Sequence, residues 1–146
     1  MLQSLICTNL HQQIGDLLAI PGFKTMFERL GATIVWPPGP ADNFDNPDRR
    51  FVDWTDMGKF MYKGEVDRNG NRCGQGLTVF PGKQLRIGNY KNGQLHGSYN
   101  ILDQHGSRVV AMAVDGKTDG YMFKTYFDDR PQETMEFSNG EFLGKR

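Results

Sequence analysis

The sequence has 146 residues, the size of one domain or of one domain with an appended segment. Seventeen basic side chains balance seventeen acidic ones, so the net charge gives no general attraction to nucleic acid or to an anionic membrane. Eighteen glycines and ten phenylalanines are typical of a turn-rich, aromatic β protein rather than of a helical bundle.

The cysteines and the first 20 residues favour an intracellular protein. Cys7 and Cys73 lie far apart and form no CxxC pair, so a disulfide framework is not expected. The sequence also lacks an Asn-x-Ser/Thr sequon. Polar side chains are scattered through residues 1–20, and no basic region precedes an apolar core, so this start predicts neither a membrane span nor a secretory signal.

Residues 1–50 predict two short amphipathic helices and an extended arm. Apolar residues at helical spacing form a first stripe (Leu10, Ile14, Leu17 and Leu18) and a second stripe (Phe23, Met26, Phe27 and Leu30). We expect Pro21-Gly22 to end the first helix, and Gly31 to end the second. A brief β-favouring run at 33–36 and a Pro-rich arm at 37–47 follow. Because so short a segment rarely forms a core alone, we expect it to pack on the remainder of the chain or on another protein.

From residue 51 onward, a glycine-centred string recurs every 23 or 24 residues. The clearest copy, 90–97, is an apolar residue, two turn-forming residues, glycine, three spacers and a second glycine. It returns at 113–120 and 137–144, and an upstream copy at 66–74 has one extra residue before its first glycine. Recurrence at a fixed interval indicates a repeat architecture.

Each copy predicts one β-hairpin. The turn positions are Asn69-Gly70, Asn92-Gly93, Asp115-Gly116 and Asn139-Gly140, pairs that tolerate the positive φ of tight hairpin turns. The second glycine of each copy (Gly74, Gly97, Gly120 and Gly144) predicts a bend or bulge where the return strand starts. Return strands are expected at 77–80, 99–102 and 121–127. Because only two residues follow Gly144, the fourth copy predicts no return strand and an open strand edge near 133–142.

Hairpins that follow one another along the chain predict a mainly β fold. We expect a meander of hairpins in a single twisted antiparallel sheet at 51–146, with the helical segment and Pro-rich arm at 1–50. A single sheet has two faces, and a short helical segment covers only one of them. The other face is then available to a ligand or a partner.

The repeats resemble the MORN (membrane occupation and recognition nexus) family. The resemblance spans 60–144 and is carried by Tyr62-Lys63-Gly64-Glu65-Val66 with Gly70, Gly74 and Gly76, and by Gly88-Asn89-Tyr90 with Gly93 and Gly97. The opening Tyr is replaced by Arg86 and Val109 in copies two and three, and the closing Gly by Tyr99 and Met122. The resemblance implies two strands per unit and a place in ciliary, cytoskeletal or organelle-membrane complexes.

Two sets of residues are candidates for binding. The repeat aromatics Tyr62, Tyr90, Tyr99, Tyr126 and Phe137 are candidates for contact with a protein partner, with ordinary cross-strand packing as the alternative interpretation. Lys83, Arg86 and Lys91 are candidates for holding an anionic phospholipid headgroup, an activity that the resemblance implies. The alternative for these three is a solvated face of mixed charge.

The sequence predicts no catalytic residue, metal or cofactor. Asp67, Asn69 and Asn71 have the spacing of a calcium loop, but Arg72 stands where glycine is required, so we expect a turn there. The histidines (His11, His96 and His105) stand alone, without a second ligand at metal-binding spacing.

We therefore expect a non-enzymatic accessory or scaffold subunit that docks on a larger protein assembly through its repeat sheet and amino-terminal arm. The alternative hypothesis is a peripheral membrane module that binds anionic phospholipid headgroups. Neither hypothesis includes nucleic acid as a partner.

Overall fold

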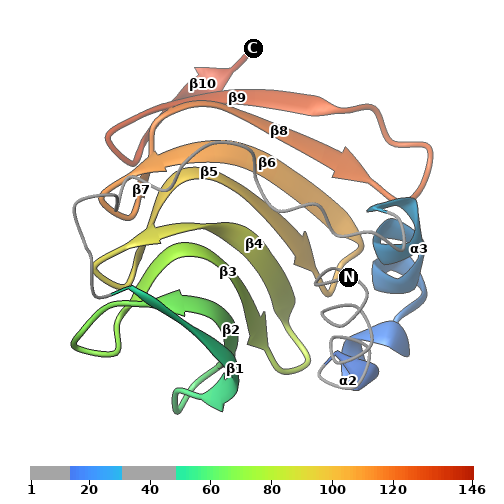
Figure 1. The fold of residues 1–146 in the computed structure, drawn as a ribbon. Helices are drawn as coiled ribbons and strands as arrows, with labels where there is room; N and C mark the ends of the chain where they lie inside the picture. The colour runs from blue at the N-terminus through green and yellow to red at the C-terminus, as the bar shows by residue number, and fades with distance from the viewer. Residues whose placement is uncertain (1–13, 31–48) are drawn as a thin grey trace.

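The computed structural model describes residues 14–30 and 49–146. In these residues, ten antiparallel strands form one open sheet, and two short helices precede it (Figure 1). The predicted mainly β meander is therefore confirmed. The β-favouring run at 33–36, the Pro-rich arm at 37–47 and Leu10 lie outside the described residues.

The strands lie in the sheet almost in chain order. They are β1 (Arg50–Asp56), β2 (Met61–Val66), β3 (Arg72–Phe80), β4 (Gln84–Lys91), β5 (Gln94–Asp103), β6 (Ser107–Val114), β7 (Lys117–Thr118), β8 (Gly120–Tyr126), β9 (Glu133–Ser138) and β10 (Glu141–Lys145). Each strand pairs with its chain neighbours, except that the two-residue β7 pairs with β6 and stands off the main path. The remainder of β6 pairs with β8.

Three of the four predicted tight turns have the expected backbone. Asn92, Asp115 and Asn139 have φ of 50–52°, and the glycine after each has φ of 80–86°. Positive φ at both central residues is the type I′ geometry that matches the twist of the flanking strands. The first hairpin differs because its extra residue lengthens the loop, where the Asp67 carboxylate accepts hydrogen bonds from the N–H groups of Asn69 and Asn71. The predicted turn is thus confirmed at this position.

The second glycine of each copy lies at an irregularity, as expected, but in three of the four copies it lies inside the return strand rather than before it. Pairing shifts register around Gly74, Gly97 and Gly144, and Gly120 follows the break between β7 and β8. The return strands β3 and β5 therefore begin directly after the turns, earlier than expected, whereas β8 matches the strand expected at 121–127. The expectation that the fourth copy lacks a return strand is wrong, because β10 pairs with β9.

The helices are α2 (Gly15–Leu18) and α3 (Pro21–Leu30). Pro21-Gly22, which we expected to end the first helix, follows the end of α2 at Leu18 and also opens α3. Proline suits the first position of a helix because its missing N–H would have no intrahelical partner there and its φ is already helical. The same Pro-Gly pair therefore follows the end of the four-residue α2 and begins the longer α3.

The two helices pack on one face of the sheet, which is one of the two supports expected for residues 1–50. Their buried side chains Ile14, Leu17, Phe23, Met26 and Phe27 contact Leu77, Val79, Leu85, Ile87 and Leu102. We call the face that carries these leucines, Val79 and Ile87 the helix face. The opposite face carries Tyr62, Tyr90 and Tyr99, and we call it the tyrosine face.

Candidate functional site

Three of the five predicted partner-contact aromatics lie inside the tyrosine face. Tyr62 and Tyr90 are 0% exposed and meet edge to face at 5.8 Å between ring centroids, and Tyr99 is 3% exposed. The Tyr62 hydroxyl donates to the Glu65 carbonyl at 2.7 Å. The Tyr90 hydroxyl bonds Thr78 Oγ1 at 2.7 Å. These side chains hold neighbouring strands together and present no ring to the surface.

The other two aromatics lie in the last three strands of the sheet and are half-buried. The Phe137 ring packs against Phe142, with 5.5 Å between centroids. Tyr126 is flanked by two cations, because Arg130 Cζ lies 4.0 Å and Lys124 Nζ 5.4 Å from its ring centroid. The Phe137 ring and the Tyr126 ring are therefore the accessible members of the predicted set.

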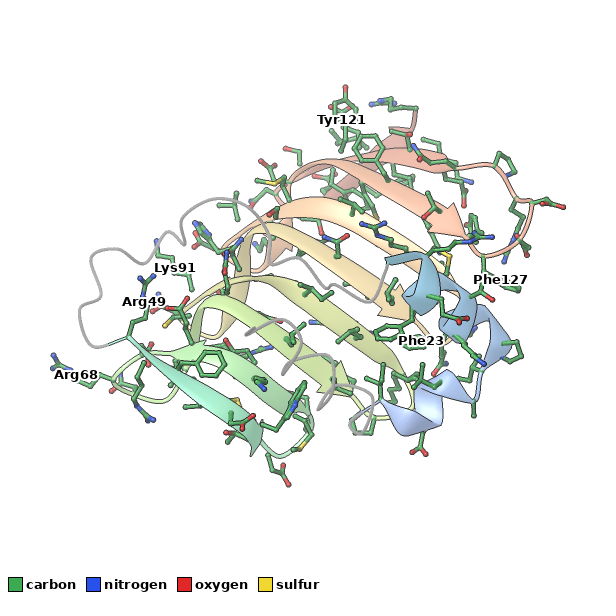
Figure 2. The ribbon with its side chains drawn as sticks, turned by 45° about the vertical axis from the view of Figure 1, so that its right-hand side comes forward. Phe23, Arg49, Arg68, Lys91, Tyr121 and Phe127 are labelled. Carbon is green, nitrogen blue, oxygen red and sulfur yellow. The ribbon has the colours of Figure 1, made fainter. Side chains whose placement is uncertain are left out.

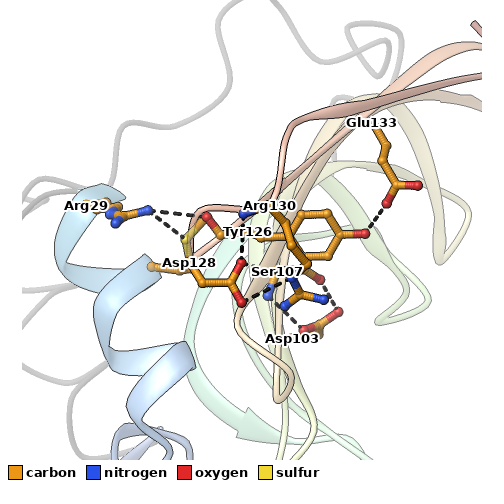
Figure 3. Close-up of polar contacts among 8 residues, drawn as sticks. Arg29, Asp103, Ser107, Tyr126, Asp128, Arg130 and Glu133 are labelled. Carbon is orange, nitrogen blue, oxygen red and sulfur yellow. Dashed lines mark hydrogen bonds and ion pairs between the residues drawn. The ribbon is translucent and has the colours of Figure 1, made fainter.

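Polar contacts fix Tyr126 and the loop around it (Figure 3). Its hydroxyl donates to Glu133, and this hydrogen bond is the largest cause that raises the pKa of Tyr126. Arg29 Nη1 donates to the Tyr126 carbonyl at 3.3 Å, which ties the end of α3 to β8. Arg130 bonds the Asp128 carboxylate and thereby lowers its pKa. The Arg29 hydrogen bond thus joins the helix to the sheet, and the other contacts hold the Tyr126 side chain and the loop after β8.

The three candidate headgroup residues are not brought together. Lys83 lies in the turn before β4, whereas Lys91 is the last residue of β4, at the other end of the strand. Eight residues of strand correspond to about 26 Å. Arg86 lies between them, half-buried, with its guanidinium 4.7 Å above the Phe80 ring centroid and its Nε bonded to Gln84. A single headgroup does not span this set.

An exposed apolar surface that the sequence interpretation missed lies on the helix face, beyond the helices. Val110 pairs with Phe123, which places the alternate residues of β6 and β8 on this face. The apolar patch consists of Met112, Val114, Tyr121 and Phe123, each between 40% and 51% exposed. In Figure 2, Tyr121 lies away from Phe23 and Phe127, where the helices meet the sheet.

Alternation in the sequence was the available signal for this patch. Tyr121 and Phe123 are two residues apart, as are Met112 and Val114, so each pair projects from one face of its strand. The sequence does not show which part of the sheet face α2 and α3 bury. The helices bury side chains of β3, β4 and β5, and α3 also contacts β6 and, through Arg29, the end of β8. The exposed part of this face therefore lies farther along β6 and β8.

Within 14–30 and 49–146 no three His, Cys, Asp or Glu side chains gather in a way that would hold a metal ion. His96 Nδ1 accepts the N–H of Asp115 at 3.1 Å, which gives this histidine a turn-fixing role. Neither described helix has the length and apolar character needed to cross a membrane.

The sequence matches no protein-family model and no curated protein. The fold and the surfaces described above are therefore the basis for a functional proposal.

Proposed function

We propose that this protein is a non-enzymatic accessory or scaffold subunit that binds a protein partner through the apolar patch. The observation that carries the proposal is that the helices bury only part of the helix face. The face is buried where α2 and α3 pack on β3 to β6, but farther along β6 and β8 it presents Met112, Tyr121 and Phe123 to solvent. Large apolar groups gathered on one face are a feature of protein-interaction sites.

The chemistry of the patch fits a protein surface. Tyr121 and Phe123 have ring centroids 6.5 Å apart, and aromatic side chains are enriched in the centres of interfaces. Both rings lie on β8, which pairs with β6 on one side and with β9 on the other, so they project from a strand inside the sheet. The proposal agrees with the resemblance to MORN repeats, which implies a place in larger complexes.

Site-specific cross-linking tests the proposal in cells. A photoreactive benzoylphenylalanine is placed at Phe123 or, as a matched control, at Phe51, a 46%-exposed phenylalanine on β1. We expect one protein to be captured reproducibly from position 123 and not from position 51. That protein, purified, should then bind the wild-type chain and the Phe51→Ser variant, and lose binding to a Tyr121→Ser/Phe123→Ser variant in calorimetry.

Two results would contradict this function. The first is cross-linking at position 123 only to lipid, together with flotation on anionic vesicles that weakens as salt rises, because this supports the headgroup alternative. The second is equal partner binding by the wild type and a folded double variant.

A further inference from the structure

A hollow lies between two hairpin turns, away from the apolar patch. It has a volume of about 400 Å³ and is lined by Lys59, Phe80, Pro81 and Lys83. Lys59 comes from the turn between β1 and β2, and the other three come from the end of β3 and the turn that leads to β4. Thr78 pairs with Arg86 and Phe80 with Gln84, which places the Phe80 ring on the tyrosine face.

The floor of the hollow is apolar. The Phe80 ring packs against Phe60 with 5.4 Å between centroids, and Pro81 continues the apolar surface. Phe80 is half-buried and Pro81 is exposed. A ligand that uses this floor therefore needs an apolar or aromatic group.

Cations surround this floor. Lys59 and Lys83 are exposed at its rim, and Arg86 lies over the Phe80 ring. The Arg72 guanidinium lies 4.4 Å from the Phe60 centroid, on the far ring of the pair. Burial lowers the pKa of Arg86, and the nearby Arg72 acts in the same direction.

These four cations have no carboxylate partner among residues 14–30 and 49–146. Arg72 bonds Thr78 Oγ1 and the Gly93 carbonyl, and Arg86 bonds the Gln84 amide, which are neutral acceptors. Other basic side chains of the sheet do form ion pairs, namely Arg49, Lys63, Arg130, Lys145 and Arg146. The hollow thus gathers cations whose charge is not neutralised by an ion pair within the described residues.

We propose that this hollow binds an acidic peptide segment of a protein partner. An aromatic or large aliphatic side chain of the peptide lies on Phe80 and Pro81, and a neighbouring carboxylate is held by Lys59 and Lys83. A bare phosphate headgroup would use the cations but leave the apolar floor without a contact. The site lies on the tyrosine face and does not depend on the apolar patch of the helix face, so either proposal can fail alone.

A defined peptide tests the site in the full-length chain. The probe is a fluorescein-labelled, capped peptide of sequence Gly-Glu-Glu-Phe-Glu-Glu-Gly, followed by fluorescence polarisation at 150 mM salt. We expect saturable binding that Lys59→Gln/Lys83→Gln weakens by about tenfold or more, as for the loss of charge-assisted contacts at an interface. The matched control, Lys91→Gln/Lys117→Gln, removes the same charge elsewhere and should bind as the wild type.

Replacing the Phe of the peptide by Ser should also weaken binding by about tenfold, because the apolar contact is lost. Amide chemical-shift mapping should place the largest changes in the turns that contain Lys59 and Lys83, and it also shows that each variant is folded. The proposal is overturned if the peptide does not saturate, if both lysine pairs have equal effects, or if the Ser peptide binds equally well. Binding of inositol hexakisphosphate or phosphoinositide vesicles without binding of the peptide would overturn it too.

Discussion

The phenol ring of Tyr62 on β2 occupies the space above Gly76 on β3 that a side chain at residue 76 would need. A Cβ built at Gly76 would overlap the Tyr62 ring and its hydroxyl oxygen. The ring has no room to move, because it is fully buried and its hydroxyl is bonded to the Glu65 carbonyl. Gly88 on β4 is confined differently, since it pairs with Tyr99 and a Cβ at Gly88 would lie 2.9 Å from Tyr99 Cβ.

We expect Gly76→Ala to lower the free energy of unfolding by about 1–3 kcal/mol, the usual cost of an inserted carbon in a tightly packed site. Urea denaturation followed by circular dichroism measures this change. The control is Gly15→Ala, where nothing lies within 4 Å of the new Cβ, and the unfolding midpoint should not fall. Equal stability of wild type and Gly76→Ala would show that the Tyr62 ring is not confined as described.

Gly22 and Gly106 bring α3 close to the turn between β5 and β6. A Cβ at Gly22 would lie 3.1 Å from Gly106 Cα and 2.9 Å from the Phe127 ring. Alanine normally favours a helix over glycine by about 1 kcal/mol, but here we expect Gly22→Ala to destabilise the protein. In a Phe127→Ala background the loss should become smaller, which a double-mutant cycle of thermal unfolding measures. A stabilised Gly22→Ala variant would contradict this close approach.

The Cys73 thiol should resist modification in the folded protein. It is buried, and desolvation followed by the charges of Glu65 and Asp67 raises its pKa to about 11. At pH 8 its thiolate fraction is then about 100-fold below that of an ordinary cysteine. In a Cys7→Ser background, we expect Ellman's reagent to react at least about 100-fold more slowly in buffer than in 8 M urea. Equal rates would indicate an open thiol.

Acid should weaken the fold partly through Glu133. Hydrogen bonds from Lys145 and then Tyr126 lower the pKa of this carboxylate in the folded state. Its contribution is therefore complete above the pKa of the unfolded chain, about 4.3, and is lost as the pH falls through the lower folded value. We expect Glu133→Gln to lose less stability than the wild type between pH 7 and pH 3. Glu141→Gln, at an exposed residue of β10, is the control in the same urea titration and should follow the wild type.

The turn-forming residues account for most of what the sequence predicts about the fold. The Asn-Gly and Asp-Gly pairs occur where φ must be positive, and this requirement is local, so the hairpins at 92–93, 115–116 and 139–140 follow from the sequence. The return strands β3 and β5 start earlier than predicted, because a glycine inside a strand and a glycine before it look the same in sequence, whereas β8 starts where expected. The end of the first helical stripe was read correctly at Pro21, but proline marks a helix start equally well.

The candidate surfaces were predicted less well, because exposure depends on what lies opposite. The repeat pattern makes Tyr62 and Tyr90 candidates for partner contact or for cross-strand packing, and both are fully buried, with Arg72 over the Tyr90 ring at 4.5 Å. Tyr121 and Phe123 are exposed only because the helices pack elsewhere. Lys59 was overlooked because its neighbours in the hollow come from a hairpin about 20 residues later in the chain.

The nearly sequential order of the strands determines how the protein would respond to mechanical load. Almost every strand is hydrogen-bonded to the strands just before and after it along the chain. Tension on the carboxyl end would therefore detach β10 first, then β9 and then β8, one strand at a time. The process would slow where α3, tied through Arg29 to the backbone of Tyr126, spans from β8 to the core beneath it. The helix α3, from the amino-terminal part of the chain, would thus resist the mechanical unfolding of the sheet from its carboxyl end.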